Sequence, residues 1–232
     1  MTRETKDAAG VTDQRFNESF LAGQERRLLY AIAPRLPQWV TPNQLTGFGV
    51  FGAFVVMMGY IFSRWDMAWL WLSNFGLLLH WFGDSLDGTV ARLRKIERPR
   101  YGFYLDQVID TIGSLMISLG IGFCPAARMD LSLLVLAVFF MLSIQVYVRN
   151  IVDREFHVAV GGLGPTEMRL GILGMNIGIL LFGRWMIPGL PFPVSWLDAT
   201  MVLTCAGLLI LLVAQMREHL GRLACEEAAG FK

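Results

Sequence analysis

Hydrophobic residues in this chain are gathered into six long runs, which short polar stretches separate. Each run provides about 20 mostly apolar residues, the length that a helix needs to cross the hydrocarbon core of a bilayer. The pattern predicts an all-α, polytopic membrane protein with six transmembrane helices. The expected spans cover residues 44–63, 67–91, 102–123, 131–152, 166–187 and 196–216.

Short motifs mark the beginnings of two of these helices. Thr41 is placed as an N-cap, with Pro42 in the first helical position and Gln44 three residues after the cap, which is a capping box. The sequence GPTE at 164–167 precedes the fifth helix in a similar way. The proline-rich segment 187–193 is expected to be the loop between the fifth and sixth helices.

Polar segments flank the predicted transmembrane domain of residues 41–216. Residues 217–232 form a C-terminal tail, and residues 1–40 lack the apolar run of a cleavable signal peptide. Between Asp13 and Val40, apolar residues are interspersed with arginines, which predicts an amphipathic helix. This helix either lies on the membrane surface or packs on the cytoplasmic face of the protein.

Composition agrees with a membrane protein, since 54% of the residues are hydrophobic and 17% are charged. Soluble domains usually contain about 25% charged residues. The three cysteines are an odd number without metal-type spacing, so we expect lipid-facing or core residues rather than a disulfide framework. The formal net charge of +1 indicates no particular partner. We expect contact with the lipid bilayer and no nucleic-acid partner.

Basic residues orient the predicted helices. One side of the topology holds both termini and the second and fourth loops, with 17 of the 20 Lys and Arg residues. The opposite side has only Arg64, Arg128 and Arg184. The positive-inside rule therefore predicts that both termini are cytoplasmic. The polar stretch 83–110 then lies at the cytoplasmic ends of the second and third helices.

Four aspartates occur in this stretch. Asp84 and Asp87 are spaced i, i+3 on the second helix, and Asp106 and Asp110 are spaced i, i+4 on the third, so each pair shares a helix face. Two antiparallel helices with a short connection can bring the faces together. An acid at the centre of a transmembrane helix costs roughly 2.5–3.5 kcal/mol. A divalent cation would neutralise the clustered carboxylates and so remove this cost. We therefore predict an all-oxygen site for one or two divalent cations.

Small and basic residues accompany the acids. Gly88 and Gly102 have no side chain at positions that face the cluster, and the small Ala91 extends the gap. Arg92 can pair with an anionic group that a cation holds. Together these residues indicate a pyrophosphate bound through divalent cations.

The aspartates have two alternative interpretations. They could form salt bridges to Arg92, Arg94 or Arg100 and mark the membrane interface. They could also mark the ion pathway of an ion-coupled membrane transporter. The second interpretation is disfavoured because all four acids gather at one cytoplasmic end.

The stretch fills every position of a known signature. In chain order, the matching residues are Asp84, Asp87, Gly88, Ala91 and Arg92, then, after nine residues, Gly102, Asp106 and Asp110. This pattern resembles the signature of the CDP-alcohol phosphotransferase (CDP-alcohol phosphatidyltransferase) family.

The resemblance implies a membrane transferase of phospholipid synthesis with two divalent ions, Mg²⁺ or Mn²⁺. An acceptor hydroxyl attacks a CDP-linked donor, a phosphodiester forms and CMP leaves. By position, Asp84, Asp87 and Asp106 resemble the metal ligands. Asp110 resembles a further ligand or the general base, and we favour the catalytic base. The active site would lie on the cytoplasmic side, at the inner membrane if the organism is bacterial.

The donor would lie against the small residues. Gly88, Ala91 and Gly102 would border the cytidine, and Arg92 would bind a phosphate. Asn43, at the start of the first helix, either reaches the phosphate or a metal ion, or is an ordinary polar residue of a first turn.

The substrate alcohol depends on the branch of the family. Residues 36–46 and 161–169 are similar to segments of the choline/ethanolamine branch, which implies a CDP-choline or CDP-ethanolamine donor and a lipid acceptor. The alternative is a CDP-diacylglycerol donor with glycerol phosphate, serine, inositol or inositol phosphate as acceptor. Gln107 and Thr111 match neither the histidine nor the lysine that often marks a branch.

A second polar cluster follows the fourth helix. Arg149, Arg154, Glu167 and Arg169 either bind a phosphorylated acceptor or serve as positive-inside anchors and internal salt bridges.

Glycines and a histidine complete the set of candidates. Gly171, Gly174 and Gly178 have the small-xxx-small spacing of close helix packing or of a homodimer interface. His80 lies one turn before Asp84, and we favour a packing role for it.

Overall fold

The computed structural model describes residues 22–153, 164–189 and 193–230, and in these ranges it confirms the all-α class. The helices are α1 (Ala22–Ile32), α2 (Pro42–Phe62), α3 (Leu70–Leu93), α4 (Pro99–Phe123), α5 (Met129–Asp153), α6 (Pro165–Phe182) and α7 (Trp196–Gly230). Single 3-10 turns cover Ala33–Arg35 and Met67–Trp69.

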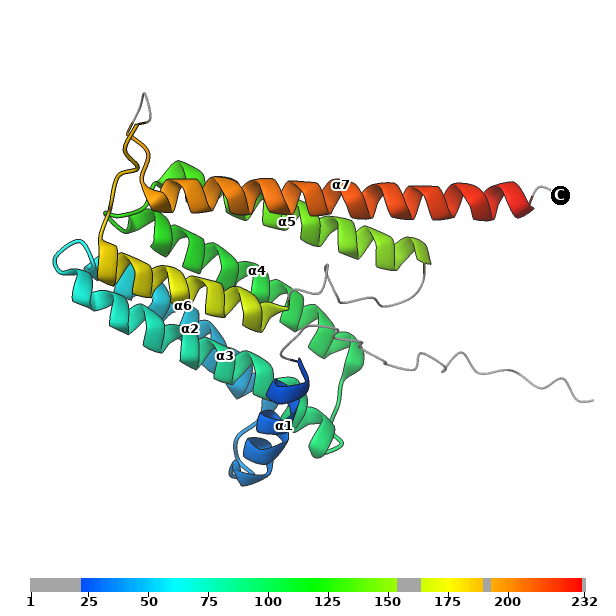
Figure 1. Ribbon diagram of the computed structural model, residues 1–232. Helices are drawn as coiled ribbons and strands as arrows, with labels where there is room; N and C mark the ends of the chain where they lie inside the picture. The colour runs from blue at the N-terminus through cyan, green and yellow to red at the C-terminus, as the bar shows by residue number, and fades with distance from the viewer. Residues whose placement is uncertain (1–21, 154–163, 190–192, 231–232) are drawn as a thin grey trace, which may run out of the picture.

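From α2 onward the helices run back and forth, so their connections alternate between two ends of the bundle (Figure 1). Helix α1, the turn between α3 and α4, and the C-terminus of α7 lie toward one end. The connections from α2 to α3, from α4 to α5 and from α6 to α7 lie toward the other. Helix α3 packs against α2 and α6, while α5 packs between α4 and α7.

Three helices are long and apolar enough to cross a membrane by length and composition. These spans are Pro42–Phe62, Met129–Asp153 and Trp196–Ala228. Helices α3, α4 and α6 match the other expected spans but fall short of this standard over their described residues. Polar and charged side chains lower the mean hydropathy of each of the three. The number of six spans therefore stays a prediction.

The predicted capping motifs are present. The Thr41 hydroxyl accepts from the backbone N–H of Gln44 (3.3 Å), and the Gln44 side chain accepts from the N–H of Thr41 (2.8 Å). At the start of α6, the Glu167 side chain accepts from the N–H of Gly164 (3.0 Å). Gly164 has no side chain to return a bond, so this cap is only the second half of a capping box.

Two predicted helix ends were wrong. Helix α6 ends at Phe182 instead of residue 187, because Gly183 adopts a φ of +58° that glycine tolerates and that a helix does not. Helix α7 continues to Gly230 rather than ending at residue 216. The tail is rich in Ala, Leu, Glu and Arg, which are strong helix formers, so the helix continues beyond the end of the apolar run.

Helices α2 and α3 approach so closely that glycines are required at their contact. A Cβ on Gly83 would lie 2.5 Å from the carbonyl oxygen of Leu45 and 2.6 Å from the Cα of Gly49. A Cβ on Gly76 would lie 2.6 Å from the backbone nitrogen of Val56. The crossing of α2 and α3 therefore fixes the polar end of α3 against the start of α2.

A buried polar contact fixes the later part of α6. Asn176 is fully buried; it accepts a hydrogen bond from the Tyr60 hydroxyl (2.6 Å) and donates one to the Asn74 side chain (2.7 Å). Breaking such a contact leaves a buried polar group unpaired, at a cost of about 1–3 kcal/mol. Asn176 therefore specifies where α6 sits on α2 and α3.

The glycines of α6 are not packed alike. A Cβ on Gly178 would meet the ring of Trp196 at 2.8 Å, whereas Gly171 and Gly174 have nothing within 4 Å among the described residues. Of these three glycines, only Gly178 packs closely against another described residue, and the homodimer stays a prediction.

Helix α1 packs on the protein. Its buried Leu29 joins Ala33 in a hydrophobic cluster with three residues of α2 and α3, namely Leu45, Leu86 and Val90. The adjacent Leu28 is exposed. Of the two predicted placements, residues 22–36 therefore show packing on the bundle, while the earlier part of the predicted amphipathic helix lies outside the described residues.

Candidate active site

The turn between α3 and α4 brings three of the predicted acidic ligands together. Lys95 in this turn has a φ of +56°, and Pro99 begins α4 where its missing N–H is harmless. One carboxylate oxygen each of Asp84, Asp106 and Asp110 lies within 4.8 Å of the others. We refer to these three residues as the aspartate cluster.

Asp87 lies beside the aspartate cluster instead of in it. Its Oδ2 accepts a hydrogen bond from the hydroxyl of Thr46 on α2 (2.6 Å), and its Oδ1 accepts one from the N–H of Gly88 (2.5 Å). The structure therefore does not bring the fourth predicted ligand together with the other three.

An arginine from α6 reaches the aspartate cluster. Arg169 forms an ion pair with Asp84, and the two side chains are only 11% and 18% exposed. A guanidinium in this partly buried place offsets the repulsion among the carboxylates. Arg169 is one of the predicted acceptor residues, and it shares the site with the predicted metal ligands.

The other predicted acceptor residues are placed differently. Arg149 lies 3.5 Å from Asp153, which also pairs with Arg222 of α7 at 2.5 Å. Glu167 caps the start of α6. Arg154 lies outside the described residues. The structure thus gives Arg149 an internal salt bridge, which was the alternative to acceptor binding.

Two residues that the sequence reasoning missed connect the aspartate cluster to α5. The Gln107 side chain donates to Oδ2 of Asp106 (3.3 Å), and the Tyr147 hydroxyl donates to Oε1 of Gln107 (2.5 Å). Gln107 directly follows an aspartate of the signature, which is a signal that could have been used. Tyr147 is an ordinary aromatic residue in its sequence context, and only the packing of α5 on α4 identifies it.

The two glycines of the predicted gap differ, since Gly102 is open and Gly88 is covered by a side chain. A Cβ on Gly102 would meet nothing within 4 Å among the described residues. A Cβ on Gly88 would lie 3.4 Å from Nη1 of Arg92, so this guanidinium lies over the glycine. The Asn43 side chain donates to the hydroxyl of Tyr101, the neighbour of Gly102 (3.2 Å). These contacts place Asn43 at the same opening.

Other polar residues nearby have structural partners. Arg94 donates to backbone carbonyls of residues 36–40, with distances between 2.5 and 3.3 Å, and so fixes the segment that follows α1. Buried His80 lies 3.1 Å from the carbonyl oxygen of Gly49, in agreement with a packing role. Ala91 is half-buried on α3.

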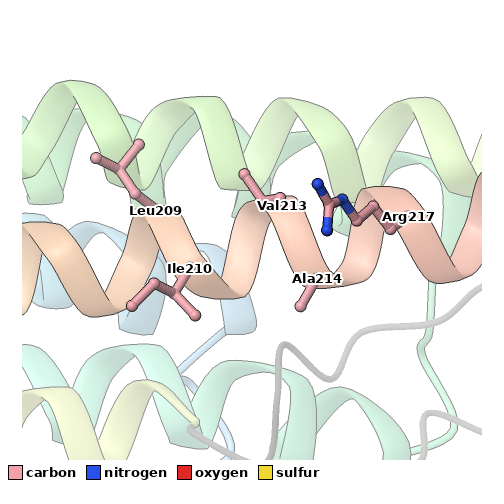
Figure 2. Close-up of a pocket in the computed structure, with 5 residues that line it drawn as sticks. All are labelled: Leu209, Ile210, Val213, Ala214 and Arg217. Carbon is pink, nitrogen blue, oxygen red and sulfur yellow. The ribbon is translucent and has the colours of Figure 1, made fainter.

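A separate apolar groove runs along α7. Figure 2 shows the residues that line it, which are Leu209, Ile210, Val213, Ala214 and Arg217. Ile210 is 70% exposed, as expected for a side chain that contacts lipid in a membrane-spanning helix. The groove shares no lining residue with the aspartate cluster.

The aspartate cluster is suited to a hard divalent cation. Its donors are carboxylate oxygens, the ligands that Mg²⁺ and Mn²⁺ prefer. Arg169 adds a planar donor group that can bind phosphate through two hydrogen bonds. The arrangement can therefore bind a phosphate or pyrophosphate between a cation and a guanidinium.

Comparison with known proteins agrees with this chemistry. The chain matches the family model described as CDP-alcohol phosphatidyltransferase over residues 39–217. It is also similar to a phosphatidylinositol phosphate synthase of Cutibacterium acnes, with 34% identity over 105 residues. That similarity covers 45% of this chain and 48% of the relative, so the chain spans about half the length of this curated relative. Because the family match covers most of the 232 residues, the protein belongs to the CDP-alcohol phosphatidyltransferase family.

Proposed function

We propose that this protein transfers a phosphatidyl group from CDP-diacylglycerol to a hydroxyl of an inositol phosphate and releases CMP. The observation that carries the proposal is the ion pair of Arg169 with Asp84, which holds a guanidinium beside the aspartate cluster. A phosphorylated acceptor supplies the anion that this guanidinium would bind. Family membership supports the reaction type, and the product named for the Cutibacterium relative supports the acceptor.

The choline/ethanolamine branch receives less support. Its similarity rested on short segments at the starts of α2 and α6. One residue of each segment has a structural task, because Thr41 and Glu167 cap these helices. Helix capping is a general requirement and carries no information about an alcohol. The named product of the relative instead agrees with the alternative of a CDP-diacylglycerol donor.

The residues present fit the divalent cation that the family reaction requires. Asp84, Asp106 and Asp110 would hold Mg²⁺ or Mn²⁺, and Asp87, whose carboxylate accepts from Thr46, would be a further ligand. Four carboxylates would suffice for two ions. When bound, the cation neutralises phosphate charge and lowers the pKa of the acceptor hydroxyl.

On the acceptor side, Asp110 is the residue proposed to take the proton of the attacking hydroxyl. The new bond joins the acceptor oxygen to the phosphorus that is farther from cytidine. The bond between that phosphorus and the bridging oxygen breaks, and its electron pair leaves with CMP. Arg169 would hold the phosphate of the acceptor and so orient the hydroxyl.

On the donor side, the opening beside the cluster would receive the nucleotide. Gly88, Gly102 and the small Ala91 would leave room for cytidine, and the Arg92 guanidinium over Gly88 would meet a phosphate. Asn43, held by Tyr101 at the same opening, would be a further donor to phosphate.

The proposed setting is a multi-pass membrane protein with six spans, cytoplasmic termini and a cytoplasmic active site, in the inner membrane if the organism is bacterial. Supporting this, α1, the α3–α4 turn and the end of α7 lie toward one end of the bundle (Figure 1), and most of the basic residues belong to segments assigned to that side. A homodimer through the open glycines of α6 remains part of the proposal.

The test of the function is a substrate panel. Purified protein with Mn²⁺ or Mg²⁺ is incubated with CDP-diacylglycerol, CDP-choline or CDP-ethanolamine and with each candidate acceptor, and CMP is measured against a chelated control. We expect CMP release with CDP-diacylglycerol and inositol phosphate. Release only with CDP-choline or CDP-ethanolamine would return the assignment to the other branch, and no release with any pair would reject the transferase.

Arg169→Gln is expected to raise the KM for inositol phosphate by about 10- to 100-fold, because a hydrogen bond between charged groups contributes roughly 1.5–3 kcal/mol. The KM for CDP-diacylglycerol should change far less, since that substrate would lie on the side of Arg92. Steady-state kinetics with each substrate varied in turn separates the two constants.

Arg128→Gln is the matched control. This arginine pairs with Asp130 at the exposed start of α5, at the opposite end of the bundle, and its loss should leave both constants unchanged. An unchanged acceptor KM in Arg169→Gln would remove Arg169 from the acceptor site.

A further inference from the structure

Glu25, in the first turn of α1, accepts three hydrogen bonds from two other helices. Its Oε1 accepts from the indole N–H of Trp81 and from the hydroxyl of Ser85, both at 2.8 Å. Its Oε2 accepts from the hydroxyl of Thr166, also at 2.8 Å. Trp81 and Ser85 belong to α3 and Thr166 to α6, so one carboxylate of α1 joins these helices.

Both helices carry a site residue within one turn of this contact. Asp84 immediately precedes Ser85, and Arg169 follows Thr166 by three positions, which is nearly one turn of α6. Asp84 and Arg169 form the ion pair of the candidate active site. The contacts therefore close a ring that runs from Glu25 to α3, across the ion pair to α6, and back to Glu25.

The two ends of α6 are held by different means. Asn176 fixes its later part through Tyr60 and Asn74. The first two turns are held by side-chain contacts that include the bond of Thr166 to Glu25 and the ion pair of Arg169. A carboxylate with three donors is a strong and directional link, because hydrogen bonds to a charged group exceed those between neutral groups.

We propose that Glu25 is a positioning residue for acceptor binding. It fixes the first turn of α6 to α3 and so sets where the Arg169 guanidinium meets the phosphate of the acceptor. The proposal rests on the proposed function, in which Arg169 binds that phosphate. It gives the N-terminal helix a part in substrate selection although α1 lies outside the aspartate cluster.

Glu25→Ala should therefore raise the KM for inositol phosphate by about tenfold, with kcat and the KM for CDP-diacylglycerol within about twofold. Glu25→Gln keeps the shape and one acceptor oxygen, so its effect should be smaller. In an Arg169→Gln background, Glu25→Ala should add little, because the group that it positions is gone. Thr166→Val should reproduce part of the effect.

Two measurements separate positioning from general destabilisation. The affinity for Mn²⁺ alone, measured by electron paramagnetic resonance without substrates, should be unchanged in Glu25→Ala. The exposed neighbour Gln24 provides a control, since Gln24→Ala should change no constant. A loss of kcat and of Mn²⁺ affinity at unchanged acceptor KM would overturn the proposal, as would full additivity with Arg169→Gln.

Failure of the proposed function would look different, because wild-type protein would then release no CMP. The positional link is tested in that case by amide hydrogen exchange of residues 168–172, where the backbone hydrogen bonds of α6 begin. Faster exchange in Glu25→Ala, but not in Gln24→Ala, would support the link between α1 and α6. Equal exchange in the two variants would overturn it.

Discussion

Asp106→Asn is expected to lower turnover by roughly a thousandfold or more, equivalent to about 4 kcal/mol, while the protein still folds. Asparagine has nearly the shape of aspartate but carries no negative charge for a divalent cation. The Gln107 side chain can still donate to the remaining carbonyl oxygen of residue 106, so local packing should persist. Asp106 belongs to the aspartate cluster and accepts a hydrogen bond from Gln107. Gln107 is in turn held by the hydroxyl of Tyr147 on α5, which helps to fix the orientation of the Asp106 carboxylate.

Three measurements define the outcome for Asp106→Asn. CMP release reports turnover, Mn²⁺ titration by electron paramagnetic resonance reports the cation site, and thermal unfolding reports the fold. Asp130→Asn makes the same chemical change at an exposed aspartate at the start of α5, and it should leave all three unaltered. Retention of more than a tenth of the activity in Asp106→Asn would contradict its assignment as a metal ligand.

Local spacing predicted most of the candidate site. Intervals of three and four residues place Asp84, Asp106 and Asp110 on facing sides of two helices, and a short connection leaves few alternatives for their pairing. Asp87 shows the limit of this reasoning. Helical phase gives a direction from the axis but not the neighbour found there, and Thr46, far earlier in the chain, receives the Asp87 carboxylate.

Contacts between distant segments were less predictable. Arg149 and Arg169 are both arginines near helix ends, and neither spacing nor composition distinguishes their roles. The structure distinguishes them by their partners, since Asp153 pairs with Arg149 and Asp84 pairs with Arg169. Glu25 was hidden for a similar reason, because its segment had the pattern of a surface helix and its partners lie 56 to 141 residues away.

The location of a helix and the positions of its ends are encoded by different features of the sequence. Apolar runs located every helix of the bundle, since burial or lipid contact requires them. Other properties determine where α6 and α7 end. Gly183 ends α6 through its backbone conformation, and the helix propensity of the polar tail extends α7. Hydropathy alone also could not foresee that the contact of α2 with α3 requires glycine.

That contact leads to the second prediction with a large effect. Gly83→Ala is expected to lower the melting temperature and to reduce turnover at least about a hundredfold, because overpacking a close contact costs roughly 1–3 kcal/mol and displaces backbone. The new Cβ would lie 2.5 Å from the Leu45 carbonyl oxygen and 2.6 Å from the Gly49 Cα. Backbone atoms cannot rotate away, so α2 and α3 must separate, and Asp84 is the next residue along α3.

Two further glycines of α2 provide a graded control series. Gly47 has nothing within 4 Å of a new Cβ among the described residues, so Gly47→Ala should be neutral or stabilising, because alanine favours helix by about 1 kcal/mol over glycine. At Gly49 the new Cβ would lie 3.3 Å from the backbone nitrogen of Asp84, so an intermediate effect is expected. Melting temperature, Mn²⁺ affinity and CMP release should all fall in the order Gly47, Gly49, Gly83. If Gly83→Ala behaves like Gly47→Ala, the close crossing does not position the aspartates; if turnover falls while Mn²⁺ affinity is kept, the crossing acts on the substrate rather than on the cation.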